Sequence, residues 1–206
     1  MRIGIDFDNT IVSYDTLFHK VAVEQGAVPA LTPPTKLAVR DHLRAIGKED
    51  VWTEMQGYVY GARMDEAEAY PGVLDFLRWA RNNAIAVNII SHKTRHPFIG
   101  QKYDLHEAAR SWIKTHLVED AQLLVSPGNV FFELTKEDKL RRIAAAGCDW
   151  FIDDLPEILQ AETFPLTAKR ILFDPEAHHA SEAVLARMSG WGEIRRHFEN
   201  LCTPSR

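Results

Sequence analysis

The chain begins MRIGIDFDNT, numbered 1–10, and the prediction of an α/β protein starts from this stretch. Residues 2–7 are a short β-forming run that ends at acids, which predicts a strand. Side chains two residues apart on a strand point to the same side, so the carboxylates of Asp6 and Asp8 are expected to converge at the strand's end. Two close carboxylates repel each other, and the pair therefore requires a cation or a shared proton.

Further apolar runs along the chain also end at polar or turn-forming residues. They comprise residues 85–90, 122–125, 130–134, 149–152 and 170–173. Helical periodicity lies between them, over residues 72–83, 105–117 and 136–146. Alternating strands and helices predict an α/β fold with a Rossmann-like, mainly parallel sheet that is buried on both faces. The tail after residue 175 is expected to form two helices, one of them around Trp191.

One stretch interrupts this alternation. Residues 15–70 contain no convincing strand, but they show helical patterns at about 15–25, 36–47 and 49–63. A proline-rich linker, Pro29 to Pro34, lies between the first two patterns. We therefore expect an α/β core made of residues 1–14 and 71–206, and an α-helical insert at 15–70 placed just after the first strand.

Composition limits the classes of function. The 206 residues carry a net charge of −5, and 46% of them are hydrophobic, which is enough for a sizeable core. A nucleic-acid or anionic-membrane surface would need a basic excess, so neither partner is expected. No stretch approaches the roughly 18 apolar residues of a membrane span. Cys148 and Cys202 indicate neither a disulfide framework nor a CxxC metal site. These features predict a cytoplasmic protein.

Polar residues follow three later strands and suit phosphoryl transfer. They are Ser91, Lys136 and the doublet Asp153-Asp154. Ligands bind at the carboxyl edge of an open α/β sheet, so these groups are expected to meet the first carboxylate pair there. Phosphoryl transfer needs a nucleophile in line with the leaving group, and cations or donors around the phosphate oxygens. Mg²⁺ prefers oxygen ligands of this kind.

Taken in order, these segments resemble the four motifs of the haloacid dehalogenase-like (HAD) hydrolase superfamily. DFDNT at 6–10 resembles the first motif, DxDx[TV], and VNIIS at 87–91 resembles the second, a hydrophobic strand ending in Ser or Thr. Lys136 resembles the third motif, and FIDD at 151–154 resembles the fourth in its double-aspartate form. The match covers most of residues 1–175, and each motif follows a predicted strand.

The resemblance implies a role for each catalytic residue. Asp6 would attack phosphorus and form an aspartyl-phosphate that water then hydrolyses. Asp8 would protonate the leaving oxygen and later deprotonate the water. Ser91 would hydrogen-bond a phosphoryl oxygen, and Lys136 would neutralise charge on Asp6 and the phosphate. Family members that cleave carbon–halogen bonds lack the second aspartate, so Asp8 favours phosphate esters.

The same resemblance implies a Mg²⁺ site. Asp6, the backbone carbonyl of Asp8 and the later doublet would hold the metal. Within the doublet, Asp154 is favoured as the direct ligand, and Asp153 would act through water. Asp153 as the direct ligand is the open alternative.

Two further sets of residues are expected at the site. The motif lysine has an alternative in Lys139, one helical turn further on, but Lys136 is preferred because it lies at the strand-to-helix junction. Backbone N–H groups near the first and second motifs could also bind an anion. The expected substrate-binding residues are Asn9, Thr10, His92 and Lys93.

The resemblance identifies the insert as a C1 cap, which excludes water from the active site and selects the substrate. A cap at 15–70 favours a small phosphorylated metabolite as the substrate. Candidate residues for reading it are Tyr14, Arg40, Arg44 and Arg63. The predicted function is a Mg²⁺-dependent phosphatase for small phosphate monoesters. The alternatives are a nucleotidase, a nucleic-acid end phosphatase, a phosphotransferase or mutase, and a catalytically silent binding module on the same fold.

Overall fold

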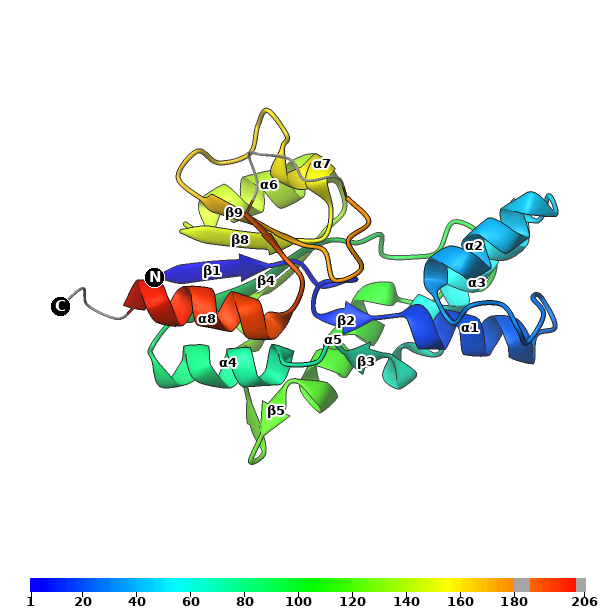
Figure 1. The fold of residues 1–206 in the computed structure, drawn as a ribbon, viewed down its shortest axis with the longest axis horizontal. Coiled ribbons are helices and arrows are strands. Elements are labelled where there is room, and N and C mark those ends of the chain that lie inside the picture. Colours follow the sequence, from blue (N-terminus) through cyan, green and yellow to red (C-terminus); the bar gives the residue numbers. More distant parts are fainter. Residues whose placement is uncertain (180–185, 203–206) are drawn as a thin grey trace. The chain divides into compact units, whose positions relative to one another are not determined.

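A computed structural model describes residues 1–179 and 186–202 of the chain (Figure 1). Its central feature is a six-stranded sheet in the order β10-β9-β8-β1-β4-β7, in which neighbouring strands run parallel. This confirms the predicted α/β class. The strands are β1 (Arg2–Ile5), β4 (Ala86–His92), β7 (Val130–Glu133), β8 (Trp150–Asp153), β9 (Lys169–Phe173) and β10 (Ala186–Met188).

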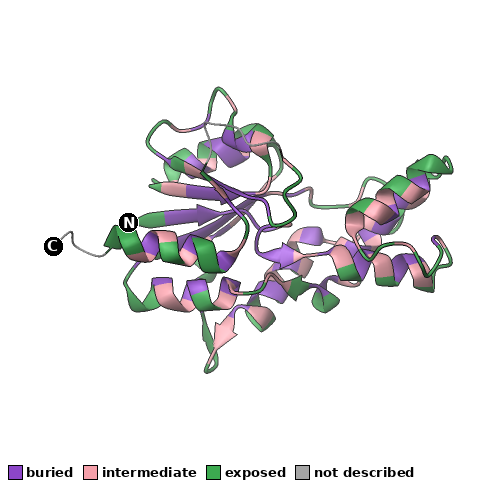
Figure 2. Cartoon of the chain, in the orientation of Figure 1, coloured by how far each residue is buried: buried purple, intermediate pink, exposed green. Residues whose placement is uncertain are grey.

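The strand order places β1 at the point where the winding of the sheet reverses. From β1 the chain builds outward through β4 and β7 on one side, and through β8, β9 and β10 on the other. In open α/β sheets such a reversal leaves a crevice at the carboxyl ends of the central strands, and ligands bind there. Figure 2 shows these strands as largely buried, as expected for a sheet covered on both faces.

Helices fix the sheet on both sides of β1. Helix α6 packs on β4 and β7, while α4 packs on β4 and α8. The ring of Phe76 in α4 lies 5.0 Å from that of Trp191 in α8. Thr135 is the N-cap of α6, because its side chain accepts a hydrogen bond from the Asp138 N–H. These helices are α4 (Val73–Asn82), α6 (Lys136–Ala145), α7 (Pro156–Leu159) and α8 (Trp191–Cys202).

The strand predicted over residues 122–125 is confirmed only at Gln122–Leu123 (β6), and it is not part of the central sheet. It pairs with Val118–Glu119 (β5) in a short antiparallel hairpin. The two residues between these strands, Asp120 and Ala121, both have positive φ angles, of 48° and 63°. That conformation is typical of a tight hairpin turn, and it diverts the apolar run away from the central sheet.

The prediction for the tail is confirmed in one half only. The helix expected around Trp191 is α8, and the rest of the described tail contains the edge strand β10 (Ala186–Met188) in place of a second helix. Residues 180–185 lie outside the described residues. Among the described residues, no helix is both long enough and apolar enough to cross a membrane.

The chain divides into two compact units. Unit 1 consists of Met1–Ile11, Ala69–His92 and Leu117–Arg206, and it contains the sheet. Unit 2 consists of Val12–Glu68 and Lys93–His116. Its helices are α1 (Asp15–Glu24), α2 (Lys36–Ala45), α3 (Glu49–Gly61), a 3₁₀ turn (Met64–Glu66) and α5 (Leu105–His116). Two short strands, β2 (Val12–Ser13) and β3 (Glu68–Ala69), pair with each other.

Unit 2 is larger than the insert expected from the sequence. Its first three helices lie within residues 15–70, but residues 93–116, which the sequence analysis assigns to the core, also belong to it. Helix α5 packs on α3 and on the 3₁₀ turn. The indole Nε1 of Trp112 donates a hydrogen bond of 2.8 Å to the carbonyl of Ala67. An apolar stripe shows that a helix is buried, but not which partner buries it.

Candidate active site

Asp6 directly follows β1 at the carboxyl edge of the sheet. Its N–H donates to the carbonyl of Ile152 at 2.9 Å, so β8 holds the backbone that carries the carboxylate. Gly4 on β1 leaves room for the side chain of Phe151 on β8, because a Cβ at position 4 would lie 2.5 Å from the Phe151 ring. The side chain of Asp6 is almost fully buried. A buried carboxylate at the winding reversal is therefore held in place by the sheet itself.

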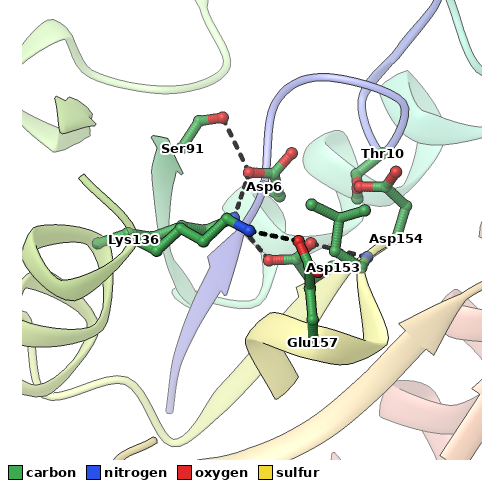
Figure 3. A network of polar contacts seen from close by, with 9 residues as sticks. Asp6, Thr10, Ser91, Lys136, Asp153, Asp154 and Glu157 are labelled. Carbon is green, nitrogen blue, oxygen red and sulfur yellow. Dashed lines mark hydrogen bonds and ion pairs between the residues drawn. The ribbon is translucent and has the colours of Figure 1, made fainter. Parts of the chain in front are cut away.

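Two donors meet one oxygen of Asp6. Ser91, on β4, donates from Oγ to Asp6 Oδ1 at 2.8 Å (Figure 3). Lys139, on α6, donates from Nζ to the same atom at 2.6 Å. Lys139 also donates to Asp153 Oδ2 at 2.6 Å, at the end of β8. No described residue donates a hydrogen bond to Asp6 Oδ2. Side chains from four segments therefore converge, as the sequence predicts for Asp6, Ser91 and Asp153.

The preference for Lys136 over Lys139 is wrong as a statement of geometry. Lys139 is 1% exposed and bridges two carboxylates, whereas Lys136 is 47% exposed and pairs with Glu157 at 2.6 Å (Figure 3). A helical side chain points back toward the helix N-terminus. Lys139, one turn into α6, therefore reaches back to the sheet edge, while Lys136, the first helical residue, points past it.

The charges at this edge are crowded. Burial is the first cause that raises the pKa of Asp6, to about 7, and the neighbouring carboxylates of Asp153 and Asp8 raise it further, while Lys139 offsets them only in part. Burial by itself would lower the pKa of Lys139, but Asp153 and Asp6 outweigh burial and raise it. The lysine is thus held as a cation, and one cation does not fully compensate the carboxylates around it.

Three carboxylates form a group that could hold a metal ion. Asp6, Asp153 and Asp154 each offer one oxygen, and these oxygens all lie within 4.8 Å of one another. Oxygen-only donors fit Mg²⁺, which binds carboxylates together with water and phosphate. Asp153 uses both oxygens elsewhere, one toward Lys139 and the other toward the Leu155 N–H at 3.0 Å. The side chain of Asp8 is not in the group, which is compatible with the backbone ligand expected from it.

The expected substrate-binding residues of the first motif serve the loop itself. Thr10 is fully buried, its Oγ1 donates to Asp154 at 3.3 Å, and its carbonyl accepts a hydrogen bond from Trp191 Nε1 at 3.0 Å. Asn9 has a φ of 57°, a left-handed conformation that asparagine tolerates and that turns the chain after Asp8. Thr10 therefore links the loop to the metal-capable group.

The two substrate-binding residues expected from the second motif belong to different units. His92 stays in unit 1, where its Nε2 lies 3.2 Å from the carbonyl of Leu134. Burial is the first cause that lowers the pKa of His92, and the charges of Lys139 and Lys136 add to it. Lys93 belongs to unit 2, where its Nζ lies 4.9 Å from the centroid of the Tyr60 ring.

The residues proposed from sequence to read the substrate have local partners. Arg40 pairs with Asp41 and Arg44 with Glu49. Arg63 pairs with two acids, Glu24 and Glu66. Tyr14 is buried, and its hydroxyl lies 3.5 Å from the sulfur of Met64. The arginines are therefore committed to acids within unit 2.

No family model and no curated protein matches the sequence. Solved structures do match. A HAD family hydrolase from Deinococcus radiodurans R1, with bound phosphate and sodium, matches with a TM-score of 0.59 and 15% identity, over 99% of this chain and 98% of that one. A HAD-superfamily hydrolase from Ehrlichia chaffeensis matches with a TM-score of 0.55 and 14% identity, over 98% and 97%. The chain has the HAD hydrolase fold.

The HAD fold does not by itself decide the chemistry. The L-2-haloacid dehalogenase RSc1362 also matches, with a TM-score of 0.57 and 11% identity over 96% of this chain and 98% of that one. At these identities the likeness concerns the fold, and one fold supports several activities. The activity of this HAD-fold protein therefore has to be argued from its own side chains.

Proposed function

We propose that this protein is a Mg²⁺-dependent phosphatase that hydrolyses small phosphate monoesters through an aspartyl-phosphate on Asp6. The observation that carries the proposal is the asymmetric binding of the Asp6 carboxylate. Ser91 and Lys139 both hold Oδ1, and no described residue donates to Oδ2. A carboxylate fixed by one oxygen and open at the other is positioned as a nucleophile.

In the first step, Asp6 Oδ2 attacks phosphorus, and the bond from phosphorus to the ester oxygen breaks. Asp8, which is half-buried and two residues from Asp6, gives its proton to the departing alkoxide. In the second step, water attacks phosphorus while Asp8 takes a proton from it. The bond to Oδ2 then breaks, so inorganic phosphate leaves and Asp6 is regenerated.

The side chains next to Asp6 can compensate the negative charge of the phosphoryl group during this reaction. The hydroxyl of Ser91 and the ammonium of Lys139 are the donors nearest the nucleophile and can meet phosphoryl oxygens. Asp6, Asp154 and the Asp8 carbonyl would hold Mg²⁺, with Asp153 bound to Lys139 instead. When bound, Mg²⁺ supplies compensation for negative charge on the phosphoryl group.

Asp8 supports a phosphate ester rather than an organohalide as the substrate. A halide ion leaves without being protonated, whereas an alkoxide is a poor leaving group unless an acid protonates it. A second carboxyl group two residues from the nucleophile can supply the proton that an ester's leaving group needs. We also propose that unit 2 acts as the cap, and that it restricts substrates to small molecules.

The proposal is tested by phosphate release from a panel of phosphate monoesters, including sugar phosphates and nucleotides, with and without Mg²⁺. We expect release that requires Mg²⁺ and is lost in Asp6→Asn. Asp120→Asn is the matched control, because it makes the same change on the exposed hairpin turn. Phosphate release that persists in Asp6→Asn, or chloride release from haloacids with no phosphate release from the panel, would refute the proposal.

A further inference from the structure

The C-terminal helix α8 contributes one side chain to the loop that carries Asp8. The indole Nε1 of Trp191, the first residue of α8, donates a hydrogen bond of 3.0 Å to the carbonyl of Thr10. Both residues belong to unit 1, although 181 positions separate them in the sequence. The mechanism above gives this contact no role.

The indole of Trp191 is held in place by other aromatic rings. Trp191 is only 1% exposed. Its ring centroid lies 5.0 Å from that of Phe76 on α4 and 5.8 Å from that of Phe173, the last residue of β9. Closely packed rings hold one another in a defined orientation. The indole N–H is therefore presented to Thr10 from a fixed position in the core of unit 1.

The acceptor lies in a tightly turned loop. The N–H of Ile11 donates to the carbonyl of Phe7 at 3.1 Å, so residues 8–10 form the turn between them. Asn9, in the middle of this turn, has the left-handed φ of 57°. Thr10 is fully buried, so solvent does not reach its carbonyl. Removing the indole N–H would take the donor from a buried carbonyl, which is costly enough to shift the loop.

The next carbonyl along the loop is anchored to the same aromatic group. The N–H of Tyr70 donates to the carbonyl of Ile11 at 2.9 Å, and the ring centroid of Tyr70 lies 4.9 Å from that of Phe173. Two consecutive carbonyls are thus held by residues that pack on one ring. Because the second anchor remains when the first is lost, removal of the Trp191 bond should displace the loop without unfolding it.

Two groups of the proposed chemistry depend on the place of this loop. Asp8 is two residues before Thr10, so a shift of the loop moves its carboxyl group, the proposed acid and base, and its carbonyl, a proposed Mg²⁺ ligand. The hydroxyl of Thr10 also donates to Asp154, in the metal-capable group, at 3.3 Å. Residues that hold metal ligands in place typically change metal affinity or activity by roughly 10- to 100-fold when they are removed.

We propose that Trp191 is a positioning residue of the active site. Through the carbonyl of Thr10 it holds the loop where Asp8 reaches the leaving group and where the Mg²⁺ ligands stay together. Helix α8 is then part of the construction of the site as well as a cover for the sheet. This role rests on the phosphatase function proposed above, because that function gives Asp8 its task.

The test removes the indole N–H and keeps an aromatic ring. In Trp191→Phe we expect the Kd for Mg²⁺, measured by isothermal titration calorimetry, to rise by roughly 10- to 100-fold. At saturating Mg²⁺, kcat for a hydrolysed phosphate monoester should still fall by a similar factor, because Asp8 remains displaced. A purely structural role for Trp191 would lower the Tm and leave the Kd and kcat unchanged.

Trp112→Phe is the matched control. Trp112 is also 1% exposed, and its Nε1 donates to the carbonyl of Ala67 at 2.8 Å within unit 2. Both variants therefore lose the same kind of buried hydrogen bond. Trp112→Phe should lower the Tm to a similar extent and keep the wild-type Kd for Mg²⁺, which separates positioning from stability.

The indole NMR signals test the same link in the wild-type protein, which covers the case that Trp191→Phe does not fold. Mg²⁺ should shift the N–H signal of Trp191 and leave that of Trp112 in place. Wild-type values of kcat and of the Mg²⁺ Kd in Trp191→Phe, or a Trp191 signal that does not respond to Mg²⁺, would overturn the role of Trp191 while the phosphatase function stands. Wild-type protein that releases no phosphate from any ester would overturn the phosphatase function and this role with it.

Discussion

The two units hold lysine side chains in different ways. In unit 1, Lys139 lies between the carboxylates of Asp6 and Asp153, each at 2.6 Å, so its charge is used within the protein to fix the nucleophile. In unit 2, the Nζ of Lys36 and the Nζ of Lys93 both lie within 5.6 Å of the centroid of the Tyr60 ring. The difference shows that the same side chain can be held by buried carboxylates at the sheet edge or packed against aromatic rings, and only the first arrangement fixes the proposed nucleophile.

The largest effect should come from removing the lysine of unit 1. Lys139→Met leaves two buried carboxylates without their shared cation, and we expect the free energy of unfolding to fall by about 3–5 kcal/mol, together with loss of phosphatase activity. Lys136→Met is the matched control three residues away, and its exposed ion pair predicts a change of no more than about 0.5 kcal/mol. Urea unfolding measures both. Equal losses in the two variants would remove the distinction between these lysines.

A smaller effect is expected from adding a second cation to unit 1. Because Lys139 only partly compensates the carboxylates, Mg²⁺ should stabilise the folded protein, by about 2.7 kcal/mol at a concentration 100-fold above its Kd. Asp154→Asn should remove most of this gain, and Asp120→Asn should keep it. Thermal unfolding with and without Mg²⁺ reports the effect independently of activity. A wild-type protein whose Tm does not respond to Mg²⁺ would contradict the metal assignment.

In unit 2 the ring of Tyr60 can be removed without changing any charge. Tyr60→Leu should lower the free energy of unfolding by about 0.5–2 kcal/mol, because the ring's contacts with the ammonium groups of Lys36 and Lys93 are lost. Tyr60→Phe keeps the ring and should remain near wild type. Urea unfolding separates the two variants. If Tyr60→Phe lost as much as Tyr60→Leu, the hydroxyl and not the ring would be the important feature.

The smallest expected effect is on the pKa of His92, which reports the charge around it in unit 1. Burial and the nearby lysines lower the pKa of His92, so its NMR titration midpoint should lie below 6.5, the ordinary value for histidine. A lowered pKa means that the folded protein binds this proton less readily than the unfolded chain does, so His92 costs stability as the pH falls through 6.5. Lys139→Met should move the midpoint upward. A midpoint at or above 6.5 in the wild-type protein would show that the lysines do not act on His92 in this way.

Much of the fold could be predicted because its signals are local. Apolar runs that end in polar residues correspond to β1, β4, β7, β8 and β9, and helical periodicity corresponds to the helices around them. The hairpin of β5 and β6 could not be predicted, because the apolar run at 122–125 is equally typical of a strand in the central sheet. The turn that diverts this run depends on positive φ angles at Asp120 and Ala121. Neither residue is a glycine, so the sequence does not mark the turn. Helix α5 was recognised, but its partner in unit 2 was not, since a stripe does not identify what covers it.

The candidate site divides in the same way. Asp6, Ser91 and Asp153 end parallel strands, and the topology brings such residues together. The choice between Lys136 and Lys139 depends on where a helix starts relative to the sheet edge. A usable signal was present, because Lys139 immediately precedes Leu140 and lies on the buried stripe with Ile143.

The proposed phosphatase function depends most directly on Asp6 as the nucleophile. Wild-type protein can be mixed with a hydrolysed phosphate ester and Mg²⁺, quenched in acid within one turnover, and digested for peptide mass mapping. We predict one added phosphoryl group on the peptide that contains Asp6, and none in Asp6→Asn treated in the same way. Phosphate release with the phosphoryl group found on another residue, or with none on the Asp6 peptide at any quench time, would contradict the account.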